Sequence, residues 1–118
     1  MLYIEDAKKT MRLIGDEDFA TEVLQSEILT IAFFWAPWSR PTNLAALILD
    51  AVAESHKGIV KVIGINMEEH TQTAKAFRVL RVPTLIYFVG GKDVARAEGF
   101  SSGRFIEATI KKLLAVPG

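Results

Sequence analysis

Apolar residues are spaced in two ways along this chain, one typical of strands and the other typical of helices. Mostly apolar segments at 29–35 and 59–65, in which apolar and polar residues do not alternate, predict strands that are buried on both faces. Shorter apolar segments at 11–14, 84–89 and 94–98 predict three more strands, the last two joined as a hairpin around Gly90-Gly91. Strands that alternate with helices indicate an α/β domain.

The first two helices are predicted from capping residues and apolar spacing. Asp16 can cap a short helix whose buried face is formed by Phe19, Val23 and Leu24. Ser39 can cap a longer helix in which Pro41 suits the first turn, and Gly58 lies just beyond its end. Apolar residues recur at helical spacing in this second helix, which predicts an inner face of Leu44, Leu47, Ile48, Ala51 and Val52.

Two further helices follow in the second half of the chain. Residues 71–80 predict a helix with Ala74 and Phe77 turned inward, and Ser101 or Ser102 can cap the last helix. The inner face of the last helix is predicted to contain Phe105, Ile106, Thr109, Ile110, Leu113 and Leu114. The final residues 116–118 are expected to be frayed.

Length and charge narrow the possible functions. The 118 residues fit one domain, 1–118, in which 1–10 form an N-terminal extension. Fourteen basic residues balance fourteen acidic ones, which gives no electrostatic reason to expect a nucleic acid or membrane partner. The N-terminus lacks the basic segment and long apolar run of a secretory signal, so we expect a cytoplasmic protein.

Several motifs give the chain a resemblance to the thioredoxin family over residues 11–114. Phe34-Trp35-Ala36-Pro37-Trp38 resembles the strand that leads into the active-site loop of that family, and Arg81-Val82-Pro83-Thr84 resembles its cis-proline loop. Gly90-Gly91 and Gly99-Phe100-Ser101 resemble its last turn and its glycine segment. The resemblance implies a thioredoxin fold: a central mixed sheet flanked by helices, in the order βαβαβαββα.

The residues that carry redox chemistry in that family are replaced here. Ser39 and Thr42 match the two cysteines of the Cys-x-x-Cys motif, and the chain contains no cysteine. Neither hydroxyl can replace the thiolate that attacks a disulfide. The resemblance also matches Phe33 to a buried aspartate and Gly64 to a buried lysine. Since buried charges are costly, these apolar replacements indicate a site that lost its chemistry and was then repacked.

Other chemistry finds little support in the sequence. A nucleophilic Ser39 would need a base, but His56 lies about 25 Å along the same helix at 1.5 Å per residue, and His70 has no clear role. Glu68-Glu69-His70 contains ligand-type residues, but adjacent side chains diverge. We therefore expect no catalytic residue, no metal site and no cofactor.

A binding surface remains. In the thioredoxin family, substrate peptides lie in a shallow groove beside the cis-proline, and the resemblance places the following residues there: Trp38, Arg40, Pro41, Val82, Pro83, Gly99 and Phe100. This predicts a redox-inactive adaptor or chaperone-like module that binds a protein or peptide. Two alternatives stay open: a disulfide oxidoreductase altered at its cysteines, and a structural domain that self-associates, with this groove as the homodimer face.

Overall fold

The computed structural model describes residues 10–115 and contains a five-stranded mixed sheet in the order β1-β3-β2-β4-β5. β1 (Arg12–Ile14), β3 (Val60–Asn66) and β2 (Leu29–Trp35) run parallel, whereas β4 (Thr84–Val89) and β5 (Lys92–Glu98) form an antiparallel hairpin on β2. The predicted mixed sheet is confirmed. The predicted extension 1–10, apart from its last residue, and the predicted frayed end lie outside the described residues.

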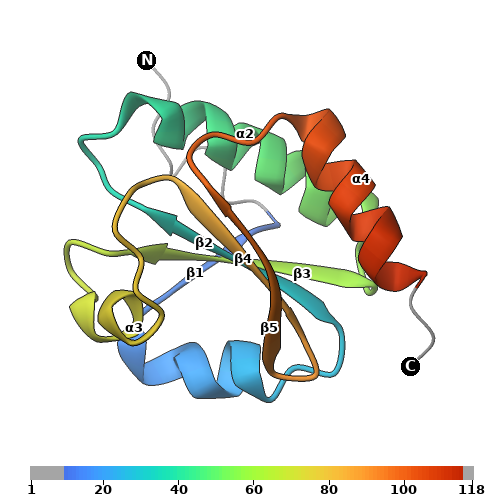
Figure 1. The fold of residues 1–118 in the computed structure, drawn as a ribbon, viewed down its shortest axis with the longest axis horizontal. Helices are drawn as coiled ribbons and strands as arrows, with labels where there is room; N and C mark the ends of the chain where they lie inside the picture. Colours follow the sequence, from blue (N-terminus) through green and yellow to red (C-terminus); the bar gives the residue numbers. More distant parts are fainter. Residues whose placement is uncertain (1–9, 116–118) are drawn as a thin grey trace.

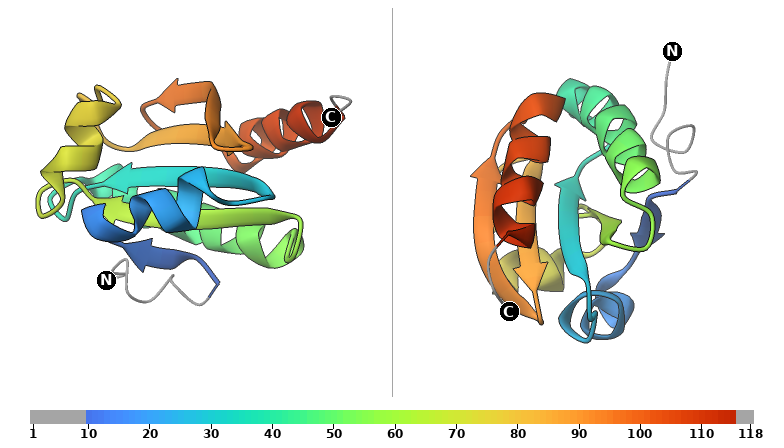
Figure 2. Two further views of the ribbon diagram at one scale, coloured as in Figure 1. Left: turned by 90° about the horizontal axis from the view of Figure 1, so that it is seen from below. Right: turned by 90° about the vertical axis from the view of Figure 1, so that its right-hand side faces the viewer.

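Helices cover both faces of the sheet (Figures 1 and 2). On one face, α2 (Arg40–Ser55) and α4 (Gly103–Leu114) pack over a core that includes Leu49 and Ile106. On the other face, the short α3 (Thr71–Ala76) and the helical turns η1 (Asp16–Asp18) and η2 (Ala20–Leu24) enclose a second core around Phe34 and Phe88. Within residues 10–115, every helix is too short or too polar to cross a membrane.

The predicted inner face of α2 is confirmed at Val52, and Ile48 packs half-buried against the core, but the other three predicted positions are wrong. Leu44, Leu47 and Ala51 are exposed, and the buried residues are Thr42, Ala45, Ala46, Leu49, Val52 and Ala53. The helix is apolar around most of its circumference, so periodicity alone does not select a face. The structure turns Leu49 and Val52 toward the sheet together with three alanines, and leaves Leu44 and Leu47 outside.

The segment after β1 also differs from the prediction. It forms a 3-10 turn followed by a π-helical turn, and although Phe19 and Val23 are buried as predicted, Leu24 is exposed. Asp16 does not cap this segment. Its carboxylate accepts hydrogen bonds from the backbone N–H groups of Gln72 and Thr73 and from the Thr73 hydroxyl, the last at 2.7 Å. Asp16 therefore holds the start of α3 against η1.

The last two helices are partly as predicted. The Ser102 hydroxyl caps α4 by accepting from the Phe105 N–H at 3.1 Å, and Ile106 and Ile110 are buried. Phe105 and Leu114, predicted to face inward, are exposed. Each adjoins a position that faces the core, and successive helical side chains diverge by about 100°. α3 ends at Ala76 and not at residue 80, which leaves Leu80 in the following loop.

Candidate functional site

The strand register brings three loops to one end of the sheet (Figure 1). Phe34, near the end of β2, pairs with Thr84 at the start of β4, and Thr84 pairs with Glu98 at the end of β5. The loops 36–39, 80–83 and 99–102 therefore begin or end beside one another. The Gly99 N–H donates to the carbonyl oxygen of Pro83 at 2.8 Å and so links two of these loops directly.

The positions that match the two cysteines lie where this end of the sheet meets α2. Ser39 precedes the helix as predicted, but its hydroxyl makes no capping hydrogen bond. Ser39 and Thr42 are both buried, and the Thr42 hydroxyl has no hydrogen-bond partner within residues 10–115. The two residues are one helical turn apart, and the Thr42 N–H donates to the Ser39 carbonyl at 3.2 Å.

Within the described residues, no histidine or carboxylate is hydrogen-bonded to the Ser39 hydroxyl. His56 follows the last residue of α2, at the far end of that helix, and its Nε2 lies 2.7 Å from Oε1 of Glu107. His70 precedes α3, with its Nε2 3.9 Å from Oε2 of Glu69. The described residues therefore do not assemble a hydroxyl nucleophile with a base. They also contain no group of three His, Cys, Asp or Glu side chains arranged to hold a metal ion.

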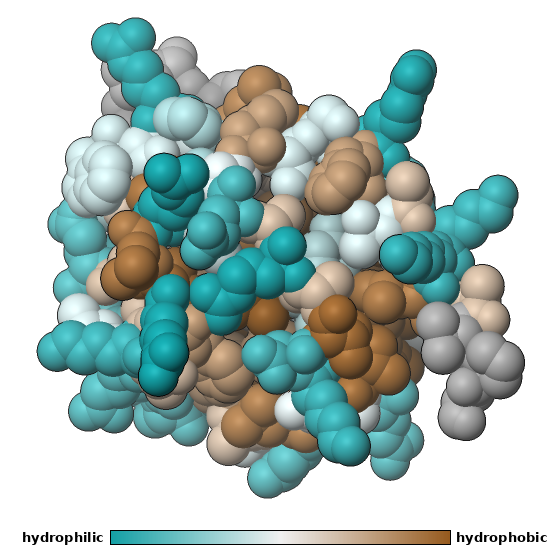
Figure 3. Space-filling view, in the orientation of Figure 1, coloured by the Kyte–Doolittle hydropathy of each residue, from teal (hydrophilic) through white to brown (hydrophobic). Residues whose placement is uncertain are grey.

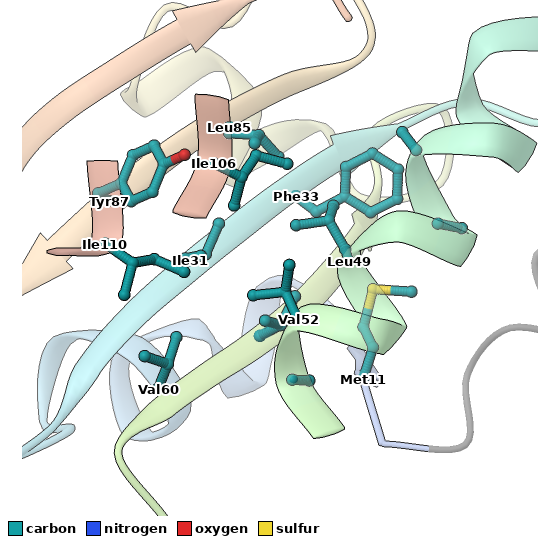
Figure 4. Close-up of a cluster of buried hydrophobic side chains, with 14 of the residues drawn as sticks. Met11, Ile31, Phe33, Leu49, Val52, Val60, Leu85, Tyr87, Ile106 and Ile110 are labelled. Atoms are coloured by element: carbon teal, nitrogen blue, oxygen red, sulfur yellow. The ribbon is translucent and has the colours of Figure 1, made fainter. Parts of the chain in front are cut away.

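Phe33 and Gly64 lie side by side beneath the loops. They are register partners on β2 and β3, and both are buried. Figure 4 shows Phe33 in the apolar cluster that also holds Leu49 and Leu85. A Cβ atom on Gly64 would lie 2.8 Å from Cδ2 of Leu13 and 3.4 Å from Nε1 of Trp35. Because that space is filled, no side chain fits at Gly64 without displacing its neighbours.

The two tryptophans of the loop differ in exposure. Trp35 closes β2 and is 6 % exposed, as expected of a core residue, although its Nε1 has no hydrogen-bond partner within residues 10–115. Trp38, three residues later, is 70 % exposed. Large aromatic side chains usually bury most of their area. The indole ring of Trp38 is therefore exposed to solvent at this end of the sheet.

The residues predicted to line a groove surround the same end of the sheet, and we call them the loop surface. Four of the seven, Trp38, Arg40, Pro41 and Phe100, are exposed, whereas Pro83 is buried and Val82 and Gly99 are half-buried. The Val82–Pro83 peptide bond is cis. Gly99 has a φ of +90°, with open space where a Cβ would be, so the backbone conformation and not crowding favours glycine there.

One half-buried residue of the loop surface, Val82, has unpaired backbone polar groups in the described part of the chain. Within residues 10–115, neither its N–H nor its carbonyl oxygen has a hydrogen-bond partner. Val82 lies two residues before β4, and the carbonyl oxygen of the intervening Pro83 accepts the hydrogen bond from Gly99. An N–H and a C=O free on one residue beside a strand form the pair that an added extended chain requires.

Two exposed residues of this region were missed by the sequence analysis. Leu80 is 87 % exposed, and Arg81 beside it is exposed as well. The sequence predicts Leu80 within the third helix, and that prediction gives no reason to expect its exposure. Arg81 belongs to the motif that resembles the cis-proline loop, and the balanced charge of the whole chain does not single it out. A count of charges over the three loops, in place of the whole chain, would have identified it.

A cavity and three ionisable groups with shifted pKa values lie away from the loop surface. The cavity, of about 610 Å³, lies between the last turns of α2 and α4, with His56, Glu107 and Lys111 among its lining residues. Partial burial opposes ionisation of Asp16, but hydrogen bonds from Thr73 and Gln72 prevail and lower its pKa. The hydrogen bond from Lys61 lowers the pKa of Glu22, and burial raises the pKa of Tyr87.

Known proteins resemble this chain over most of its length. A family model described as Thioredoxin matches residues 10–112. Thioredoxin 1 of Nostoc sp. is 33 % identical over 101 residues, which cover 86 % of this chain and 94 % of that protein, and the thioredoxin of Synechocystis sp. gives the same values. The thioredoxin of Haemophilus influenzae is 36 % identical over 86 residues, which cover 73 % of this chain and 80 % of that protein.

Proposed function

Because the chain belongs to the thioredoxin family and contains no cysteine, we propose that it is a redox-inactive member that binds a protein or peptide through its loop surface. Disulfide exchange proceeds through a thiolate and a mixed disulfide. Ser39 and Thr42 supply neither, since a hydroxyl does not ionise near neutral pH and forms no bond to sulfur under these conditions. In this proposal the protein acts as an adaptor or chaperone-like module in the cytoplasm.

The observation that carries the proposal is the unpaired backbone of Val82 at the same end of the sheet as the exposed ring of Trp38. An extended peptide that pairs with the Val82 N–H and C=O would add a short strand at this end of the sheet. Its side chains would then meet Trp38 and Phe100, which are 70 % and 46 % exposed. Exposed tryptophan is enriched among residues that dominate binding energy. None of these contacts requires a thiol.

The alternative of an altered oxidoreductase has less support. Phe33 and Gly64 stand where the family resemblance places a buried aspartate and a buried lysine. Both positions are surrounded by apolar side chains, and Phe33 is 0 % exposed. Substituting Cys at both Ser39 and Thr42 and measuring reduction of a small disulfide substrate tests this alternative. Activity close to that of a thioredoxin control would support it. We expect weak or no turnover, because the groups that assist proton transfer are absent.

Self-association is the second alternative. Figure 3 shows apolar side chains scattered among hydrophilic ones on the face that includes β5 and α4, without a continuous apolar expanse of the kind found in stable dimers. This view argues against a dimer formed through the face drawn in Figure 3, and it does not bear on the other faces. Light scattering would favour a homodimer through the loop surface if the protein ran as a dimer and Trp38→Ala converted it to a monomer.

The proposal is tested by capture followed by mapping. The native protein, Trp38→Ala and Ile59→Ala would be used as baits in native lysate, with bound proteins identified by mass spectrometry. Ile59 is a matched control because it is apolar, 54 % exposed and directly before β3, at the opposite end of the sheet. A synthetic segment of each captured protein would then be titrated into labelled protein and followed by amide chemical shifts.

We expect a partner that is retained by native protein and Ile59→Ala but lost by Trp38→Ala. Amide shifts on titration should concentrate at residues 38–41, 81–84 and 99–101. Identical capture by all three baits, or shifts confined to other surfaces, would show that the loop surface is inert and would overturn the proposal.

A further inference from the structure

The charge around the loop surface is strongly asymmetric, although the whole chain is neutral. The three segments that form this end of the sheet, 36–42, 78–84 and 98–104, contain one acidic residue, Glu98, and four basic ones: Arg40, Arg78, Arg81 and Arg104. Oε2 of Glu98 already lies 4.0 Å from Nη1 of Arg96, a residue outside these segments. The charge of the four arginines is therefore not balanced by the segments that carry them.

The four arginines are exposed and have no ion-pair partner within residues 10–115. Arg96, by contrast, is held in place, since its guanidinium donates to the carbonyl oxygens of Phe77 and Arg78. Arg96 thereby fixes the chain just before the loop that carries Arg81. The scaffold of this loop is anchored, while the guanidinium of Arg81 is left for another molecule.

Arg40 stands at an unusual place for a cation. It is the first residue of α2, a helix of 16 residues whose first turn contains no acidic residue and whose preceding Ser39 provides no side-chain cap. The positive end of the helix dipole disfavours a guanidinium at this position and favours an anion. A carboxylate from outside would be attracted both by the helix terminus and by Arg40.

Carboxylates elsewhere at this end of the sheet do not remove the asymmetry. Glu68 and Glu69 follow β3, which lies across β2 from β4 and β5. Glu69 lies beside His70. Neither glutamate forms an ion pair with the four arginines within the described part of the chain. The surface next to Val82 therefore keeps its excess of positive charge.

We propose that the partner of the loop surface is an extended acidic segment, with carboxylates placed to meet Arg40 and Arg81 while its backbone pairs with Val82. This inference rests on the proposed function and adds the chemical class of the ligand. Alternate side chains of an extended strand project to the same side. A segment with acidic residues at every second position would thus direct several carboxylates toward the end of the sheet where Arg40 and Arg81 are exposed. Such charge complementarity sets specificity and accelerates association.

Three fluorescent peptides test the proposal directly. They are blocked nine-residue chains that share Val, Thr and Phe at fixed positions and carry Glu, Gln or Lys at three alternate positions. Their affinity would be measured by fluorescence anisotropy at low and at physiological ionic strength, with a ten-nucleotide strand of thymidine as a fourth probe. We expect the Glu peptide to bind on the order of tenfold more tightly than the Lys peptide at low salt, and the difference to shrink as salt rises.

Two double variants give matched changes of charge. Arg40→Glu/Arg81→Glu should reverse the preference, so that the Lys peptide binds better than the Glu peptide. Lys92→Glu/Lys112→Glu changes the net charge equally at exposed positions in the β4–β5 hairpin and near the end of α4. It should preserve the preference for Glu. Circular dichroism and thermal melting would confirm that both variants are folded.

The outcomes separate this inference from the function on which it rests. Equal binding of the three peptides, with binding still lost in Trp38→Ala, would overturn the acidic ligand and leave the binding surface intact. Binding of the nucleotide strand as tight as that of the Glu peptide would overturn the choice of a peptide ligand. Absence of binding by every probe would overturn the inference, while the capture experiment above decides the proposed function.

Discussion

Phe33 of β2 and Gly64 of β3 are register partners in the parallel ladder, and the interior closes over both of them. In the family resemblance these two positions carry a buried aspartate and a buried lysine. In this chain, a Cβ on Gly64 would already lie 2.8 Å from the Leu13 side chain. The two replacements are therefore one structural change, since neighbouring apolar packing occupies the volume that a charged pair would need.

Placing an aspartate at position 33 without a lysine at position 64 should destabilise the folded protein. We expect Phe33→Asp to lower the free energy of unfolding by about 4 kcal/mol or more, because it removes a fully buried ring and leaves an unpaired carboxylate in its place. Phe33→Leu should cost about 1–2 kcal/mol, since it retains most of the apolar volume. Urea denaturation at pH 7 measures both. A cost below about 1 kcal/mol for Phe33→Asp would contradict the view that the site has been repacked.

Stability should fall in acid through Asp16. Hydrogen bonds from Thr73 and Gln72 outweigh partial burial and lower its pKa in the folded state, so the unfolded chain takes up its proton first as pH falls. The contribution of Asp16 is thus fully present above its unfolded pKa of about 4 and is lost as pH decreases through the lower folded value. Glu22, whose pKa Lys61 lowers, acts in the same direction.

The carboxylate can be tested by two substitutions. We expect Asp16→Ala to cost about 1 kcal/mol at pH 7 because α3 loses its cap, and to flatten the dependence of stability on pH between about 5 and 2. Asp18→Ala is the control, since Asp18 is exposed and makes no side-chain hydrogen bond within residues 10–115. Denaturant titrations across that pH range provide the measurement. An unchanged pH profile in Asp16→Ala would refute the assignment.

Adjacent glycines of the β4–β5 turn should respond differently to alanine. Gly90 and Gly91 both have positive φ, but a Cβ on Gly90 would meet open space, whereas one on Gly91 would lie 2.4 Å from the backbone oxygen of Leu24. Gly90→Ala should therefore cost about 1–2 kcal/mol from backbone strain alone. Gly91→Ala should cost clearly more, because backbone must move. Similar melting temperatures for the two variants would show that the contact with Leu24 is unimportant.

Substitution of Trp35 should affect mainly stability, whereas substitution of Trp38 should affect mainly binding. Trp35→Ala removes a side chain that is 6 % exposed and should lower the free energy of unfolding by about 3–5 kcal/mol. Trp38→Ala removes one that is 70 % exposed and should change stability by no more than about 0.5 kcal/mol while it weakens partner binding. Thermal melts and peptide titrations of both variants distinguish these effects. A large loss of stability in Trp38→Ala would assign that residue to the core.

The strands were predictable because their signal is local. Residues 29–35 and 59–65 are mostly apolar, and the structure forms strands at Leu29–Trp35 and Val60–Asn66. The absence of cysteine is likewise a property of the sequence alone, and it removes disulfide exchange whatever the fold. The order of elements and the sequence motifs together were sufficient to predict the thioredoxin fold.

Tertiary structure decided which faces are buried and which groups are free. The inner face of α2 could not be predicted from a helix with apolar residues on most sides, because the choice depends on how the helix packs against the sheet and α4. Asp16 caps a helix more than 50 residues away, and sequence spacing carries no signal for such a contact. The excess of exposed arginines likewise arises only when three separate loops meet at one end of the sheet.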